Sequence, residues 1–168
     1  TVEFWSNTGG MFYGLAKLSA AGIPTIAILH GLSTAGGAYQ PGMSDYVVGV
    51  KKNGMAALAG PALLKAATGQ IADKDELGGS EMHARITGLV EYLAEDDEHA
   101  IKITREVIDK IDWNSSLKSR ENISFDNPIY DVNELIGVVS ADYKIPYDVR
   151  EVVARLVDGS DFIDFKPL

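Results

Sequence analysis

The hydrophobic pattern predicts helices separated by short apolar runs. Residues 11–21 place their apolar side chains on one helical face, and Gly22 follows as a C-terminal stop. The clearest helix covers about residues 96–112, with acidic residues at its start and Lys110 near its end, as the helix dipole favours. Its inner stripe is expected to consist of six residues: Ala100, Ile103, Thr104, Val107, Ile108 and Ile111.

Two shorter helices are indicated by the residues at their ends. Pro61 is expected at the first helical position of one helix, where proline loses no hydrogen bond, and Gly69 ends that helix. Ser80 is expected to cap a second helix, which Gly88 closes.

Three short runs of apolar residues predict strands. Residues 23–29 are apolar almost throughout and rich in β-branched side chains, which is typical of a strand buried on both faces. The other strands are expected over residues 46–51 and 90–93. Strands that alternate with helices indicate an α/β fold with a layered core.

The composition changes after residue 113. Residues 114–128 are polar with little periodicity, which makes this stretch the best candidate for a linker. Beyond it, Asp148 and Glu151 form a potential capping box for a last helix, which Asp158-Gly159 is expected to end.

Charge and composition exclude several classes of function. The 168 residues include 15 Lys and Arg against 24 Asp and Glu, so the net charge is −9. An acidic chain repels phosphate groups, which argues against nucleic-acid binding and against docking on anionic membranes. There is no cysteine, hence no disulfide or thiolate nucleophile, and no His spacing typical of a metal site.

The ends of the chain are typical of a fragment. It begins at Thr1 rather than Met and stops at Leu168, directly after an apolar segment. No apolar run approaches the length that spans a bilayer, and no signal peptide precedes the first helix. We therefore expect part of a cytoplasmic protein, or of a mitochondrial matrix protein if the source is eukaryotic.

The glycine-rich stretch after the first strand is the best candidate for chemistry. Gly36 and Gly37 adjoin a predicted helix start, where backbone N–H groups lack intrahelical partners and can stabilise charge on a carbonyl oxygen. The alternative is that both glycines only permit tight packing of strand and helix. The pattern lacks the spacing of a phosphate-binding loop or of a nucleophilic serine elbow.

Other polar residues near this stretch have more ordinary interpretations. Ser33 is expected to satisfy backbone groups, and Asp45 to cap or end a short helix or, less simply, to orient the loop. His83 is expected on an exposed or half-buried helix face, and His99 in solvent.

Ordered motifs along nearly the whole chain resemble the carboxyltransferase subunit of biotin-dependent acyl-CoA carboxylases, above all its methylcrotonyl-CoA and geranyl-CoA branch. The matching motifs are Gly22-Ile23-Pro24, Thr34-Ala35-Gly36-Gly37-Ala38-Tyr39, Met43-Ser44-Asp45, Leu58-Ala59-Gly60-Pro61, Glu76-Leu77-Gly78-Gly79 with His83, Asp96-Asp97, Pro146-Tyr147-Asp148 and Arg155-Leu156-Val157-Asp158-Gly159-Ser160.

The resemblance implies a crotonase-like fold, a ββα superhelix. Residues 1–113 would be the later part of an N-terminal domain that holds acyl-CoA, residues 114–130 a linker, and residues 131–168 the start of a second, related domain. Each active site would lie at a dimer interface of a homo-oligomer. A biotin carboxylase and carrier subunit would deliver carboxybiotin, so this chain would bind no biotin covalently.

The resemblance also implies roles for individual residues. Gly36 and Gly37 would give the backbone amides that hold the oxygen of a thioester enolate. The biotin enolate left after CO₂ release would remove the substrate proton, so that no side-chain base is required. The residues expected to contact substrate are Thr34, Ala35, Ala38, Tyr39, Gly60 and Pro61.

Two other functions fit a related fold. One is a decarboxylase subunit of a sodium-pumping complex, which would have a membrane partner and depend on Na⁺. The other is a non-catalytic crotonase-like module, which would not bind acyl-CoA.

Overall fold

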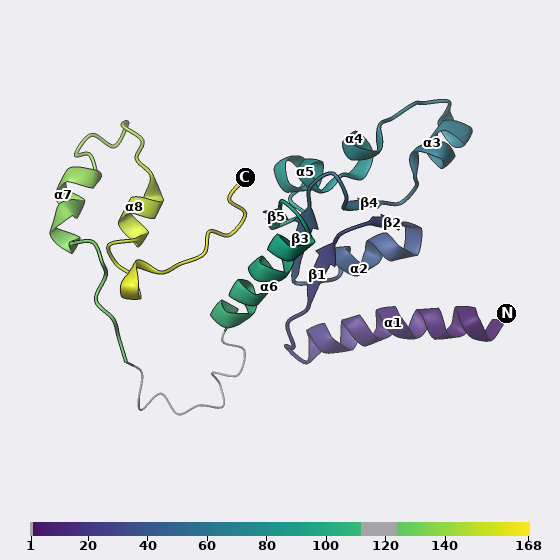
Figure 1. The fold of residues 1–168 in the computed structure, drawn as a ribbon, viewed down its shortest axis with the longest axis horizontal. Helices are drawn as coiled ribbons and strands as arrows, with labels where there is room; N and C mark the ends of the chain where they lie inside the picture. Colours follow the sequence, from purple (N-terminus) through teal and green to yellow (C-terminus); the bar gives the residue numbers. More distant parts are fainter. Residues whose placement is uncertain (1, 112–123) are drawn as a thin grey trace. The chain divides into compact units, whose positions relative to one another are not determined.

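The computed structural model describes residues 2–111 and 124–168, which belong to two compact units. The first unit consists of residues 1–113 together with residues 165–168, and the second of residues 114–164 (Figure 1). Most of the predicted linker lies outside the described residues.

The first unit alternates short strands with helices. Its elements are, in chain order, α1 (Val2–Ala20), β1 (Ile26–Leu29), β2 (Leu32–Thr34), the 3₁₀ turn η1 (Ala35–Ala38), α2 (Tyr39–Gly42), β3 (Tyr46–Val50), β4 (Met55–Ala57), α3 (Pro61–Thr68), α4 (Lys74–Gly78), α5 (Ser80–Met82), the π-helical turn η2 (His83–Thr87), β5 (Tyr92–Ala94) and α6 (Asp97–Ile111).

A parallel three-stranded sheet in the order β1-β3-β5 contains the three predicted strands. Helix α6 contacts all three strands (Figure 1). The central strand β3 is buried along nearly its whole length, whereas three of the four residues of β1 are only half-buried. The prediction that this first strand is buried on both faces is therefore wrong, because β1 lies at an edge of the sheet.

A second parallel sheet pairs β2 with β4, and the sequence pattern predicts neither strand. Each has only three residues, too few to show an alternating pattern. The hydrophobic core joins the two sheets, since Val47 of β3 and Ala56 of β4 belong to one buried cluster with Ala84 of η2 and Val90.

Close approach of backbones fixes the start of β4. A Cβ atom on Gly54 would lie 2.2 Å from the backbone oxygen of Leu29 and 2.3 Å from the Ser80 Oγ atom, so that only glycine fits. The buried Ser80 hydroxyl donates to the Gly54 oxygen at 3.1 Å. The prediction that Ser80 caps a helix is wrong: Gly79 is the N-cap, and Ser80 links the helix to β4.

The predicted helices are present with some changes of length. Helix α1 begins at Val2 rather than near residue 11, and Gly22 follows it with φ +68°. Helix α3 begins at Pro61 and ends before Gly69, as predicted. Within α6, Ala100 and Val107 are buried, but Ile108 is 59% exposed.

Ile108 is exposed because it lines an open pocket of about 420 Å³ beside the start of β1. The predicted stripe on α6 therefore contacts the sheet only in part. The pocket is lined by Ile23, Pro24, Ile26, Thr104, Ile108 and Ile111.

The second unit contains η5 (Val132–Glu134), α7 (Leu135–Val138), α8 (Val149–Val153) and η6 (Asp158–Ser160). Asp148 caps α8 by accepting from the Arg150 N–H at 3.0 Å, as predicted. The helix ends at Val153, however, well before the predicted Asp158-Gly159.

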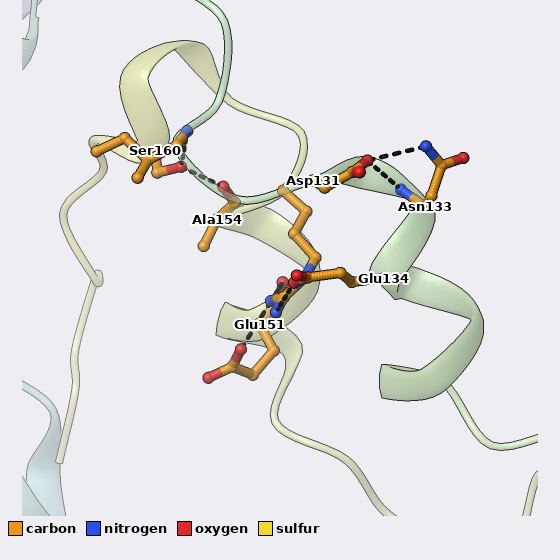
Figure 2. Close-up of polar contacts among 8 residues, drawn as sticks. Asp131, Asn133, Glu134, Glu151, Ala154 and Ser160 are labelled. Carbon is orange, nitrogen blue, oxygen red and sulfur yellow. Dashed lines mark hydrogen bonds and ion pairs between the residues drawn. The ribbon is translucent and has the colours of Figure 1, made fainter.

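An arginine links the helices of the second unit. Arg155 is 8% exposed and donates to Glu134 at 2.7 Å and to Glu151 at 2.7 Å (Figure 2). Its guanidinium lies 5.2 Å from the centre of the Tyr130 ring. The hydrogen bonds that Arg155 donates to the Glu151 and Glu134 carboxylates raise the pKa of Arg155 above its usual value. The Glu151 side chain therefore bonds to Arg155 and not to the start of α8, as it would in a capping box.

No helix among the described residues is long and apolar enough to cross a membrane.

Replacing Gly54 by Ala should destabilise the first unit by about 3 kcal/mol or more, because the added methyl group meets backbone that cannot move aside. Urea denaturation of the whole polypeptide measures the change. Gly10→Ala is the matched control: nothing lies within 4 Å of its Cβ position in α1, and the substitution should leave stability unchanged or raise it by up to about 1 kcal/mol. Equal effects of the two substitutions would contradict the packing described here.

Arg155→Lys should lower the melting temperature of the second unit, because an ammonium group cannot bond two carboxylates in the fork geometry of a guanidinium. Differential scanning calorimetry of the whole polypeptide checks this. Arg105→Lys on α6 serves as the control, and a similar shift for both variants would show that the network contributes nothing specific.

Candidate functional site

Two turns leave the second sheet at the same end. Strands β2 and β4 are parallel, and Thr34 pairs with Ala57, the last residue of each strand. The chain after Thr34 forms η1, and the chain after Ala57 leads through Leu58 to Gly60. Both turns therefore begin at the carboxyl end of the two strands. The structure thus brings together two motifs whose first residues, Thr34 and Leu58, are 24 positions apart in the sequence.

The first turn directs the backbone sharply away from β2. Ala35 has φ +51°, a left-handed conformation that is unfavourable for a residue with a side chain. Gly36 follows and is exposed, and Gly37 is half-buried. In a 3₁₀ turn each bond joins a residue to the one three positions earlier, so the first N–H groups have no partner within the turn.

The two glycines have different amounts of space around them. A Cβ atom on Gly36 would lie 3.8 Å from the Phe12 ring, an ordinary contact, whereas one on Gly37 would lie 3.1 Å from the Ser33 Oγ atom. Gly36 is the second residue of η1, and its N–H group precedes the first hydrogen bond of the 3₁₀ turn. Gly37 is the third residue, and its N–H group donates that first hydrogen bond. Gly36 is therefore the more accessible donor.

The residues after the glycines belong partly to the core. Ala38 packs against the buried cluster that contains Val47 and Ala56. Tyr39 is 53% exposed, and its ring meets the edge of Phe12 from α1 at a centroid distance of 6.0 Å. Thr34 and Ala35 are exposed.

The second turn ends in a helix start. Gly60 is the N-cap of α3 and Pro61 its first residue, and the Gly60 oxygen accepts from the N–H groups of Leu63 and Leu64, each at 3.1 Å. Leu58 and Leu63 are 68% and 61% exposed. Leu58 therefore places an apolar side chain in solvent directly after β4, at the end of the sheet from which η1 also begins.

Other residues considered from the sequence lie elsewhere in the network. Asp45 accepts from the backbone N–H and hydroxyl of Thr25 at 2.7 and 2.9 Å, so it joins the start of β3 to the residue before β1. Its side chain therefore bonds to Thr25 and does not cap a helix, contrary to the expectation of a cap. His99 accepts from the Glu95 N–H at 3.2 Å, at the start of α6.

His83 has a more specific position than its sequence context indicates. It is half-buried, as expected, but its ring also lies 2.7 Å from the carbonyl oxygen of Ala56 in β4. Its distance of 27 residues from Ala56 gives no local signal, so sequence reasoning missed this contact.

Titratable groups with a shifted pKa lie outside the two turns. Burial, assisted by Tyr46 and Glu91, raises the pKa of Tyr92 on β5, and the other shifted group is Arg155 of the second unit. Among the described residues, no three His, Cys, Asp or Glu side chains lie close enough to hold a metal ion. Backbone N–H groups are thus the polar feature that the two turns offer to a ligand.

Comparison with known families decides what this arrangement belongs to. The carboxyl transferase domain model matches residues 1–168. The chain is a member of that family. A probable biotin-dependent acyl-coenzyme A carboxylase beta2 subunit from Mycobacterium tuberculosis is 52% identical to it over 166 residues, which are 99% of this chain and 31% of that protein.

Two solved structures of carboxyl transferases are similar to the chain. The beta subunit of Pseudomonas aeruginosa geranyl-CoA carboxylase is 49% identical, with a TM-score of 0.61 over 96% of this chain and 30% of that one. Transcarboxylase 12S with methylmalonyl-coenzyme A and methylmalonic acid bound is 36% identical, with a TM-score of 0.79 over 99% of this chain and 32% of that one. The crotonase-like α/β fold is confirmed, and the chain spans about a third of the length of these relatives.

Ala35→Gly should leave stability unchanged or raise it by up to about 1 kcal/mol, because glycine adopts the left-handed conformation without strain. The matched control is Ala66→Gly in the exposed middle of α3, which should cost about 1 kcal/mol. Urea denaturation of the whole polypeptide compares them. If both substitutions destabilise the protein equally, the left-handed conformation at Ala35 is not retained in solution.

Proposed function

We propose that the protein containing this chain transfers a carboxyl group from carboxybiotin to an acyl-CoA, and that the two turns hold the thioester. The observation that supports this most is the parallel pairing of Thr34 with Ala57. It brings the backbone donors of η1 and the apolar turn before α3 to the same end of the β2–β4 sheet. Membership of the carboxyl transferase family supports the reaction type.

The chemistry requires stabilisation of a negative oxygen. Removal of a proton next to a thioester, or conjugated with it, places charge on the carbonyl oxygen. In the proposal, the N–H groups of Gly36 and Gly37 donate to this oxygen, with the Gly37 N–H shared between the oxygen and the turn, as is common at helix starts. Such donors are typically worth about 10²–10³-fold in rate each.

The remaining residues of the turns are proposed to shape the pocket. Thr34 and Ala35 fix the direction in which the glycine N–H groups point, and Ala38 anchors the turn to the core. Tyr39 offers an exposed aromatic face beside the turn. Gly60 and Pro61 form the opposite wall, and Leu58 and Leu63 give it an apolar surface suited to a short branched acyl group such as 3-methylcrotonyl.

Carboxybiotin would supply the carboxyl group as CO₂. The biotin enolate left after CO₂ release would be the base that takes the substrate proton. This agrees with the hydrogen bonds of Asp45 and His83, which are made with Thr25 and Ala56 and not with either turn. Biotin would be carried by a partner subunit, and the residues that bind it would come from the C-terminal half of a dimer mate in a homo-oligomer.

The proposed domain limits follow from the same assignment. Residues 1–113 form the acyl-CoA side of an N-terminal domain, residues 114–130 a linker, and residues 131–168 the start of the second domain. The proposed location is the cytoplasm, or the mitochondrial matrix in a eukaryote.

Gly37→Pro tests the function by removing one N–H donor. Introduced into the whole subunit and assayed with its biotin-carrying partner, it should lower the rate constant for carboxylation of acyl-CoA at least about 100-fold, because one of the two donors to the enolate oxygen is lost. Gly42→Ala is the control: it lies at the end of α2, outside the proposed site, nothing lies within 4 Å of its Cβ position, and it should keep the wild-type rate.

Oligomeric state and melting temperature establish that each variant is folded. A folded Gly37→Pro variant with unchanged carboxylation would rule out the role of this turn. Decarboxylation that depends on Na⁺ would favour the decarboxylase instead, and absence of acyl-CoA binding by calorimetry would favour a non-catalytic module.

A further inference from the structure

Strand β4 has one edge that β2 covers and one that faces α5 and η2. Successive residues of a strand direct their backbone groups to opposite edges. The Met55 N–H donates to the Gly31 oxygen at 3.0 Å, on the side of β2. The carbonyl groups of Gly54 and Ala56, on either side of Met55, therefore point to the other edge.

Two residues of one helical turn satisfy these two carbonyl groups. The Gly54 oxygen accepts from the Ser80 N–H at 2.9 Å and from the Ser80 hydroxyl at 3.1 Å. The Ala56 oxygen lies 2.7 Å from Nε2 of His83. Ser80 and His83 are three residues apart, and thus on one helix face. Together with the isolated antiparallel bridge between Met55 and Gly79, they bond the edge of β4 that faces away from β2.

The partners of the His83 ring define which nitrogen carries the proton. A carbonyl oxygen only accepts, so Nε2 must donate to Ala56. The other ring nitrogen, Nδ1, lies 2.8 Å from the hydroxyl oxygen of Thr87 and accepts from it when the ring is neutral. The His83 carbonyl oxygen, 3.3 Å from the same hydroxyl, is a second acceptor for that one proton. The Thr87 hydroxyl in turn accepts from the Leu89 N–H at 3.3 Å. The ring is thus held from both sides.

Ala56 lies one residue before the point where both turns begin. It pairs with Ser33, and the next pair is Thr34 with Ala57. Ala56 is buried, so bulk water cannot reach its carbonyl oxygen and replace the lost donor. Loss of the His83 donor would leave this carbonyl unpaired and free the end of β4 to move relative to β2.

We propose that His83 is a positioning residue for acyl-CoA binding: its Nε2–H holds the Ala56 carbonyl, and thereby the wall formed by Leu58, Gly60 and Pro61. This rests on the proposed function. Because η1 follows β2 rather than β4, the donors of Gly36 and Gly37 stay in place when His83 is lost. The expected effect is therefore on KM for acyl-CoA and not on kcat.

A matched pair of substitutions separates the two ring nitrogens. The amide nitrogen of glutamine reaches the position of Nε2, whereas that of asparagine reaches only the position of Nδ1. In the whole subunit with its partner, His83→Asn should raise KM for acyl-CoA about tenfold with kcat nearly unchanged, and His83→Gln should restore the wild-type KM. Hydrogen exchange of a peptide covering residues 55–61 should quicken about tenfold in His83→Asn and not in His83→Gln.

A histidine that matters only for stability would lower the amount of active enzyme, and hence kcat, at unchanged KM. His30→Gln is the control, because His30 is exposed and outside this network, and it should change neither constant. The proposal is overturned if His83→Asn keeps the wild-type KM, or if His83→Gln raises KM as much as His83→Asn does. Where His83→Asn does not fold, His83→Gln must still keep the wild-type KM and the wild-type exchange of residues 55–61, and a rise in either overturns the proposal.

Failure of the proposed function has a different outcome. If the wild-type enzyme does not carboxylate acyl-CoA, the reaction assigned to the site is wrong. The exchange of residues 55–61 still tests the hydrogen bond from His83 to Ala56 in that case, since it requires no turnover.

Discussion

The position of β4 depends on a contact between backbones that no side chain can enter. Gly54 lies against the Leu29 oxygen, and Ser80, small enough to fit beside it, bonds to the Gly54 oxygen. This contact connects β1 of the first sheet, β4 of the second sheet and the start of α5. The register of β4 with β2, and with it the meeting of the two turns, follows from this constraint.

A site built in this way relies on backbone geometry more than on side chains. The left-handed Ala35 turns the chain out of β2, and Gly36, which follows it, is exposed. The strain at Ala35 is held by strand pairing on one side and by the packing of Ala38 on the other. Backbone N–H donors do not reorganise when charge develops, which suits stabilisation of an enolate.

The sequence predicts the long elements well, because their periodicity is local. Strand β3, helix α6 and the stop at Gly69 follow from hydrophobic spacing and capping chemistry. It does not predict β2 or β4, whose three residues are defined by pairing with distant segments. Ser80 and Asp45 were expected to cap helices. Ser80 bonds instead to Gly54, 26 residues away, and Asp45 to Thr25, 20 residues away, and no local sequence pattern predicts such distant partners. The motif residues of the candidate site could be named in advance from family resemblance. That the two turns begin at the same end of one sheet, and that His83 bonds to Ala56 beside them, is seen only in the fold.

The π-helical turn over His83–Thr87 has a consequence for how this chain can vary. An α-helix advances about 100° per residue, so removing one residue from this turn could restore regular helical bonding. The segment that follows would then rotate by the same angle, and Val90, which is buried in the core, would face outward. The number of residues between His83 and Gly88 is therefore more strictly constrained than the identity of the exposed Arg85 and Ile86, and a deletion there would be far more harmful than a substitution of either.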